Sequence, residues 1–280
     1  MNGPMTDLAR PQAPAPRPVL AVAHRGDPYR HRENTLPSIE SALAAGADAV
    51  EVDVRLTRDR VPVLLHDATL ERLWGDPRRL DRVTVEQLDE VRDGGYAVPT
   101  LAEALKTAAA APAARLLIDL DDPTPAAAAW EAVTGLGAEQ RVAFCGPATA
   151  MLAVRELAPG AEIALTWKQP RLPARALLDD LRPRYLNPPF GLATPEFTAA
   201  AHHAGLAVST WTADLRRTMR RLRAVGVDSI TSNRIAVLCS VLDGRAARDG
   251  GPAAAGRRAL SGRDLGRHLL GGRPAPEGRR

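Results

Sequence analysis

The chain has 280 residues, of which 45% are hydrophobic, so it can bury a full core as one barrel-sized domain or two small ones. Its formal net charge is +4, but residues 243–280 contain nine Arg against four Asp and Glu, a balance of 9 − 4 = +5 that leaves 4 − 5 = −1 for the rest. The basic balance therefore lies in the C-terminal segment, which argues against nucleic-acid binding by the folded part.

Membrane and secretory classes are also disfavoured by the sequence. No apolar run reaches the roughly 18 residues that a transmembrane helix needs. Residues 1–18 lack the apolar stretch of a secretory signal. Cys145 and Cys239 are far apart and lack metal-ligand spacing, so we interpret them as buried free thiols in a reducing compartment. We expect a cytoplasmic protein, whereas its oligomeric state cannot be predicted.

Both ends of the chain have the composition of disordered segments. Residues 1–18 are rich in Pro and Ala, and residues 243–280 are rich in Gly, Pro and Arg. Such segments cannot bury enough apolar surface to fold. We therefore expect a single folded domain over residues 19–242.

The first predicted elements form a strand, a helix and a second strand. An apolar run over 19–23 is followed by a helix that Thr35 can N-cap, with Pro37 in its first turn and Gly46 at its end. A second apolar run follows over 49–54 and completes a βαβ unit.

The same alternation continues to residue 242 and predicts an α/β fold, the (β/α)8 TIM barrel. The expected strands are 19–23, 49–54, 116–120, 141–145, 162–166, 184–187, 206–211 and 229–232. The expected later helices are 99–110, 125–135, 147–157, 173–181, 194–204, 215–225 and 235–242. Eight strands interleaved with helices favour a closed barrel over an open sheet. Residues 68–98, with a helix-like stretch at 84–91, are too long for a loop and are expected to be an insertion that caps or flanks the barrel mouth.

Carboxylates follow several of these strands. In a barrel of this kind the active site lies at the C-terminal strand ends, where Glu51, Asp53, Asp119 and Asp121 are expected. Because strand side chains alternate, Glu51 and Asp53 share one face, as do Asp119 and Asp121. Converging carboxylates repel one another unless a cation lies between them. Oxygen ligands suit Mg²⁺, Ca²⁺ or Mn²⁺ rather than zinc. The alternative is that these carboxylates are solvated or paired with arginine.

Two histidines and an arginine complete the candidate site. His24 and His66 each end an apolar run beside charged residues, which favours an acid/base pair over a structural role. The planar donor fork of Arg25 suits a phosphoryl oxygen, although a salt bridge to Glu33 or Asp53 is the plainer alternative.

The sequence resembles the glycerophosphodiester phosphodiesterase family, as shown by motifs in the right order and spacing. These are A-H-R-G at 23–26, E-N-T at 33–35, G-A-D-A-V-E-V-D-V at 46–54, L-T-R-D at 56–59 and V-L-L-H-D-A-T-L-E-R at 63–72. Weaker matches continue to residue 242, and the resemblance covers residues 19–242.

The resemblance implies a TIM-barrel hydrolase that splits glycerophosphodiesters into sn-glycerol 3-phosphate and an alcohol with a divalent cation. It implies that His24 and His66 are the general acid and base. Its implied metal ligands are Glu51, Asp53 and Asp119, the last replacing a usual glutamate. Arg25 and Glu33 would contact the substrate or its phosphate, and Trp211 would wall the substrate pocket.

Two positions depart from the family pattern. Asp121 stands where the family usually has a phosphate-binding lysine, and Lys168 is a candidate to restore that charge. Asn233-Arg234 replaces a usual acidic residue and proline. Two further hypotheses therefore stay open: a related phosphodiesterase acting on lysophospholipids, and a catalytically weakened barrel that only binds phosphodiesters.

Overall fold

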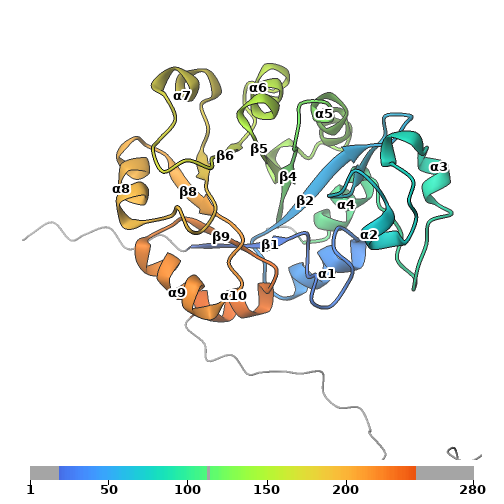
Figure 1. Cartoon of the computed structure of the whole chain (residues 1–280), viewed down its shortest axis with the longest axis horizontal. Helices are drawn as coiled ribbons and strands as arrows, with labels where there is room; N and C mark the ends of the chain where they lie inside the picture. The colour runs from blue at the N-terminus through green and yellow to red at the C-terminus, as the bar shows by residue number, and fades with distance from the viewer. Residues whose placement is uncertain (1–18, 112–113, 244–280) are drawn as a thin grey trace, which may run out of the picture. The chain divides into compact units, whose positions relative to one another are not determined.

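The computed structural model describes residues 19–111 and 114–243. Residues 1–18 and 244–280, for which the sequence predicts disorder, lie outside the described residues. The described part is an α/β barrel in which eight parallel strands pair in the order β1-β9-β8-β7-β6-β5-β4-β2, and the pairing of β1 with β2 closes the ring (Figure 1). The (β/α)8 fold predicted from the sequence is therefore confirmed.

The bounds of the elements agree closely with the sequence pattern. The barrel strands are β1 Leu20–His24, β2 Ala49–Leu56, β4 Arg115–Asp119, β5 Val142–Gly146, β6 Ile163–Thr166, β7 Tyr185–Asn187, β8 Ala207–Thr210 and β9 Ser229–Ser232. The main helices are α1 Leu36–Ala44, α4 Leu101–Ala109, α5 Ala126–Gly135, α6 Ala148–Leu157, α7 Arg175–Leu181, α8 Pro195–His203, α9 Arg216–Val225 and α10 Ile235–Leu242. A short 3₁₀ turn, η2 (Glu139–Arg141), precedes β5.

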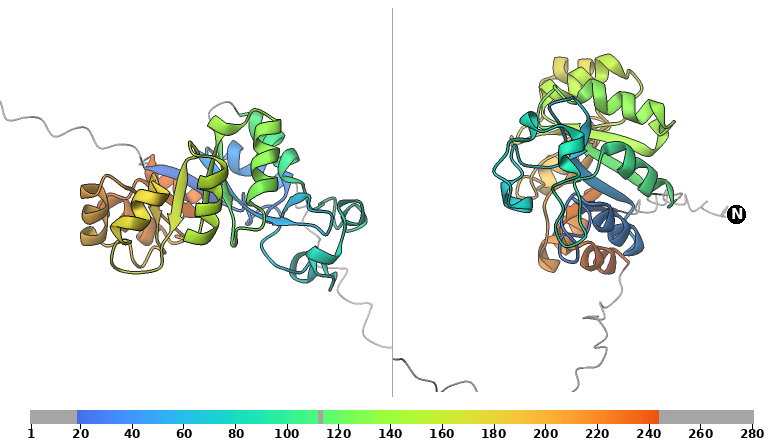
Figure 2. Two further views of the ribbon diagram at one scale, coloured as in Figure 1. Left: turned by 90° about the horizontal axis from the view of Figure 1, so that it is seen from above. Right: turned by 90° about the vertical axis from the view of Figure 1, so that its right-hand side faces the viewer.

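The insertion after β2 has its own small core. Strand β3 (Pro62–Leu64) pairs antiparallel with the far end of β2 and lies outside the barrel. The short elements that follow are α2 Glu71–Trp74, η1 Leu80–Arg82 and α3 Val85–Leu88. Their buried side chains cluster apart from the main core. The insertion extends from one side of the barrel (Figures 1 and 2).

Threonines stand at several helix starts, but the one cap predicted from the sequence is not formed. Thr100 and Thr194 each accept a hydrogen bond from the third backbone N–H of the helix that follows, as N-caps do. Thr35 occupies the N-cap position of α1 but does not cap it. Its hydroxyl instead donates to the carbonyl of Arg32 at 2.7 Å, which ties down the loop that precedes the helix.

Alternation along the strands separates two kinds of side chain. In β2, Val50, Val52 and Val54 point outward and pack in the main core between the barrel and its helices. Glu51 and Asp53 have the opposite parity and point into the barrel. An apolar cluster of Val22, Leu117, Ala143, Cys145 and Ala164 fills the inside of the barrel, and Glu51 and Asp53 line the cavity at its mouth.

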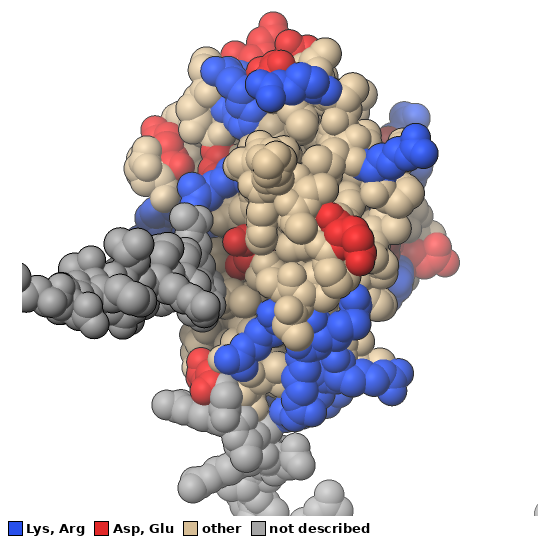
Figure 3. All heavy atoms as spheres, turned by 90° about the vertical axis from the view of Figure 1, so that its left-hand side faces the viewer, with Lys and Arg blue, Asp and Glu red and all other residues tan. Residues whose placement is uncertain are grey.

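The charge of the fold is locally uneven, which the sequence average concealed. Helix α9 carries five arginines, at 216, 217, 220, 221 and 223, and no acidic residue. Figure 3 shows its largest group of Lys and Arg side chains in the lower part, where α9 lies. The expectation that the folded part has no basic face was therefore wrong at this helix. Among the described helices, none has the length and apolar character needed to cross a bilayer.

Candidate active site

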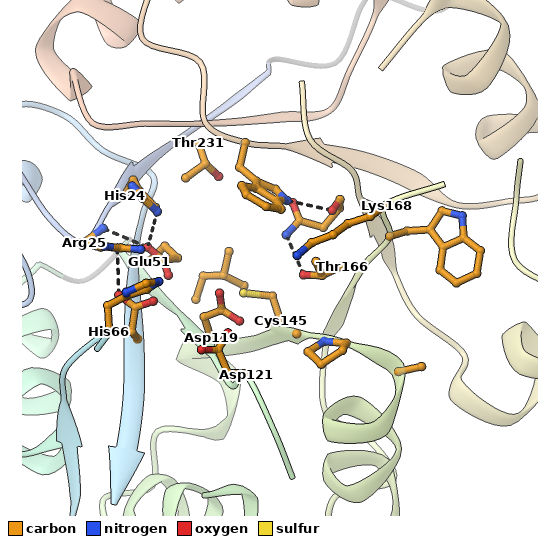
Figure 4. A pocket seen from close by; sticks show the side chains of 18 of the residues that line it. His24, Arg25, Glu51, His66, Asp119, Asp121, Cys145, Thr166, Lys168 and Thr231 are labelled. Atoms are coloured by element: carbon orange, nitrogen blue, oxygen red, sulfur yellow. Dashed lines mark hydrogen bonds and ion pairs between the residues drawn. The ribbon is translucent and has the colours of Figure 1, made fainter. Parts of the chain in front are cut away.

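A cavity of about 480 Å³ opens at the C-terminal ends of the barrel strands. The predicted site residues that line it are His24, Arg25, Glu51, Asp53, His66, Asp119, Lys168 and Trp211. Its wall also includes Asp121, Cys145, Thr166 and Asn187. Closure of the barrel thus brings together residues from strands that are far apart in the sequence (Figure 4).

Three carboxylates form the acidic side of the cavity. Ligand oxygens of Glu51, Asp53 and Asp119 lie within 4.8 Å of one another. Burial, together with the neighbouring Asp53 and Asp119 charges, raises the pKa of Glu51 well above its usual value. Burial and the charges of Asp53 and Asp121 raise the pKa of Asp119 to about 7. Such mutual repulsion in an all-oxygen cluster fits a site for a hard divalent cation.

The loop after β1 holds Arg25 against this cluster. Its backbone N–H donates to Glu51 Oε2 at 3.0 Å, and its guanidinium Nε lies 3.0 Å from Asp53 Oδ2. The turn requires Gly26, because φ there is +88° and a Cβ would lie 2.3 Å from the hydroxyl of Ser38. Asn34 fixes Asp53 from the other side by donating to Oδ2 at 2.6 Å. The A-H-R-G and E-N-T motifs therefore orient one metal-ligand candidate together.

His24 is held in one tautomer by residues that sequence reasoning missed. Its Nδ1 lies 2.7 Å from Asn233 Oδ1. The amide of Asn233 is itself oriented by Asp214, which accepts from its backbone N–H and from Nδ2. Asn233 Oδ1 is thus an acceptor, so Nδ1 of His24 carries the proton and Nε2 is free to accept one. Burial and the nearby Arg25 guanidinium lower the pKa of His24, which keeps the ring neutral.

Changing the partner of His24 is expected to change its protonation. The double variant Asn233→Asp, Asp214→Asn places a carboxylate beside Nδ1 and keeps an amide donor behind it. Because a carboxylate favours the imidazolium, we expect the pKa of His24 to rise by about one unit or more. NMR titration of the imidazole protons measures this shift. Asp214→Asn alone is the control, and an unchanged pKa in the double variant would contradict the proposed tautomer lock.

A chain of charged contacts connects His66 to Arg25. His66 Nδ1 lies 2.7 Å from Asp67 Oδ1, and Asp67 pairs with Arg72 of α2. Arg72 also contacts Glu33 at 2.7 Å, and Glu33 contacts Arg25 at 2.9 Å. The hydrogen bond from Arg72 lowers the pKa of Asp67 to about 2. Burial would raise the pKa of Glu33, but hydrogen bonds from Arg72 and Arg25 lower it.

Glu33 therefore lies behind Arg25 and does not line the cavity. The expected contact between Glu33 and substrate has no counterpart in this geometry, because Arg25 and Arg72 bind the carboxylate. Arg72, which the sequence did not single out, belongs to the insertion and joins it to the barrel site.

The opposite wall of the cavity combines aromatic and polar groups. Lys168 Nζ lies 5.7 Å from the centre of the Trp211 ring, and the Trp211 indole N–H donates to the Asn187 carbonyl. Figure 4 shows Lys168 beside Thr166 on this wall. Asn187 Oδ1 is buried without a hydrogen-bond partner. The wall offers a cation, an acceptor and an apolar ring to a substrate.

Asp121 and Cys239 differ from the expectations. Asp121 is not an isolated anion, because its Oδ2 lies 2.6 Å from Arg55 Nη2. Both cysteines are free as predicted, but only Cys145 is buried, and Cys239 is partly exposed. Burial and the adjacent Asp119 raise the pKa of the Cys145 thiol, so it stays neutral beside the carboxylates.

A model of the glycerophosphoryl diester phosphodiesterase family matches residues 24–237, which include every one of these site residues. The chain belongs to this family. It is similar to the glycerophosphodiester phosphodiesterase of Caldanaerobacter subterraneus subsp. tengcongensis, with 26% identity over 77% of this chain and 94% of the relative. Family membership confirms the predicted enzyme class, a phosphoric diester hydrolase.

Solved structures share the barrel. A Silicibacter pomeroyi protein is 26% identical and superimposes with a TM-score of 0.75 over 82% of this chain and 95% of the other. An Oleispira antarctica phosphodiesterase, solved in complex with the product sn-glycerol-3-phosphate, is 22% identical and has a TM-score of 0.71 over 79% of this chain and 96% of the other. The second likeness concerns the fold alone.

Proposed function

We propose that the protein hydrolyses glycerophosphodiesters to sn-glycerol 3-phosphate and an alcohol, with a divalent cation bound by Glu51, Asp53 and Asp119. One observation carries the proposal: this three-carboxylate cluster and both candidate histidines line a single cavity at the barrel mouth. The matched family and the product named for the Oleispira antarctica relative support the same chemistry.

The donor set fits Mg²⁺, Ca²⁺ or Mn²⁺. All three ligands are carboxylates, and the repulsion that raises the pKa values of Glu51 and Asp119 would be relieved by a positive charge between them. When bound, the cation supplies positive charge that stabilises the phosphoryl oxygens as the reaction proceeds. Arg25, at the same edge of the cavity, adds a second positive charge.

The two histidines divide the proton transfers. His24, with Nε2 unprotonated, takes the proton of the neighbouring glycerol hydroxyl as that oxygen bonds to phosphorus. His66, held through Asp67, gives a proton to the departing alcohol oxygen as the P–O bond breaks. Water then opens the cyclic phosphate with the two proton transfers reversed, which yields sn-glycerol 3-phosphate.

The alternatives from the sequence become outcomes of one assay. Trp211 and Lys168 would contact the substrate. The apolar ring of Trp211 could also contact the acyl chain of a lysophospholipid, so a lysophospholipid is tested as a second substrate. The weakened barrel is less supported, because Arg55 balances the charge of Asp121. We place the reaction in the cytoplasm, since Cys145 and Cys239 are free thiols.

The test is turnover of glycerophosphocholine by the purified full chain, with release of sn-glycerol 3-phosphate measured enzymatically. We expect activity that EDTA abolishes and that Mg²⁺, Ca²⁺ or Mn²⁺ restores. Lysophosphatidylcholine is assayed in parallel by release of choline, which both substrates would yield, and faster release from it would favour the second substrate class. Activity that is insensitive to EDTA would contradict the metal site, and ligand-induced thermal stabilisation without turnover would favour the binding-only barrel.

A further inference from the structure

The side chain of Arg55 binds the backbone carbonyl of His66. It belongs to the part of β2 that extends beyond the barrel to pair with β3. Its Nε donates to the carbonyl of His66 at 2.6 Å, and its Nη2 donates to Asp121 Oδ2 at 2.6 Å. One guanidinium therefore bridges the loop that carries His66 and Asp121, the second residue after β4.

His66 needs such support because packing does not hold it. Strand β3 ends at Leu64, and the side chain of His66 is 40% exposed. Two polar contacts hold His66: its ring reaches Asp67, and its backbone carbonyl accepts a hydrogen bond from Arg55. Arg55 would lose its second anchor without Asp121, and a long side chain with several free torsions would then hold the carbonyl poorly.

We propose that Arg55 and Asp121 are a positioning pair that sets the place of His66 at the reacting centre. Asp121 then acts through Arg55, with which its carboxylate forms an ion pair. The proposal rests on the proposed role of His66 as proton donor. Neither residue needs to touch substrate, and Arg55 does not line the cavity.

A double-mutant cycle tests the pair. Arg55→Gln and Asp121→Asn are each expected to lower kcat about tenfold with KM within about twofold, and the double variant is expected to be no worse than either single change. The matched control is the exposed pair Arg175 and Asp179 on α7, at 2.8 Å and away from the cavity. Arg175→Gln and Asp179→Asn should leave kcat unchanged.

A charge swap separates positioning from charge balance. Arg55→Asp with Asp121→Arg keeps opposite charges but removes the Nε donor to the His66 carbonyl, so kcat should stay low at a melting temperature near that of the wild type. If the swap restored kcat, the proposal would be overturned, because opposite charges at positions 55 and 121 would then be sufficient without the contact to His66. A rise in KM with unchanged kcat in the single variants would instead make Arg55 a substrate ligand and overturn the proposal, as would a rate gain in Asp121→Lys.

His66→Ala distinguishes this proposal from the function on which it rests. If His66→Ala keeps the wild-type kcat, the assigned role of His66 fails, whatever the cycle gives. If His66→Ala loses activity while Arg55→Gln and Asp121→Asn do not, only the positioning pair is refuted. Melting temperatures near wild type in the single variants ensure that lost kcat reports geometry rather than unfolding.

Discussion

Replacing His24 with alanine is expected to lower kcat by roughly 10²–10⁴-fold, because the change removes the imidazole whose unprotonated Nε2 is proposed to take the glycerol hydroxyl proton. Binding of the substrate phosphate should change little, since Arg25 and the three carboxylates remain. Steady-state kinetics on glycerophosphocholine measure the loss. His66→Ala should lower kcat by a similar factor, because the departing alcohol oxygen would lose its proposed proton donor.

The control for both variants is His203→Ala, at the exposed C-terminal end of α8. It should retain wild-type kcat. Because the two histidines are proposed to serve one reaction, the double variant His24→Ala, His66→Ala should be far less impaired than the product of the two single losses. A wild-type kcat in His24→Ala would contradict the proposal that His24 is the general base.

Removing one carboxylate of the cluster is expected to abolish most turnover and to weaken cation binding. Asp53→Asn should lower activity by about 10³-fold or more at low cation concentration, since it removes one ligand charge and disturbs the contact with Asn34. Isothermal titration with Mg²⁺, Ca²⁺ and Mn²⁺ measures the affinity. Glu131→Gln, exposed on α5, is the control, and unchanged affinity in Asp53→Asn would contradict this site.

The same cluster predicts how cation affinity and stability depend on pH. Asp119 has a pKa of about 7 and Glu51 has a raised pKa, so a cation must displace protons below neutral pH. Affinity should therefore rise from pH 6 to pH 8, by up to roughly tenfold per unit for each proton displaced.

The stability of the cation-free protein should have the opposite slope. The folded state binds more protons than the unfolded state between the ordinary carboxyl pKa of 3.8 and the raised value of about 7, so unfolding becomes easier as pH increases through that window. Melting temperatures with EDTA should fall across it, and added cation should restore more stability at pH 8 than at pH 6. A flat profile would contradict the raised pKa of Asp119.

Most of the fold was predictable because apolar runs, and the residues that end a strand or a helix, are recognisable within short segments of sequence. Short apolar runs predicted all eight barrel strands, and the helix expected over 194–204 is α8, which starts at Pro195. The insertion over 68–98 was predicted from its length, whereas its contact with the site through Arg72 was not. The cap expected at Thr35 was wrong: its hydroxyl accepts no backbone N–H of α1 and donates to the Arg32 carbonyl in the preceding loop.

The candidate site divides in the same way. Parity along β2 placed Glu51 and Asp53 on one face, and the strand ends brought His24 and Asp119 to the same mouth. The sequence by itself thus determined which chemical groups are present and at which end of the barrel they lie, because alternation and strand termination are properties of short segments.

Only the tertiary structure decided which polar groups contact one another. His24 is bound by Asn233, 209 residues away, and Arg55 is bound by Asp121, 66 residues away. These contacts depend on the register of a closed barrel, which no local pattern encodes. Asp121 and Asn233 differ from the residues that the family usually has at these positions. In the fold they are the partners of Arg55 and His24.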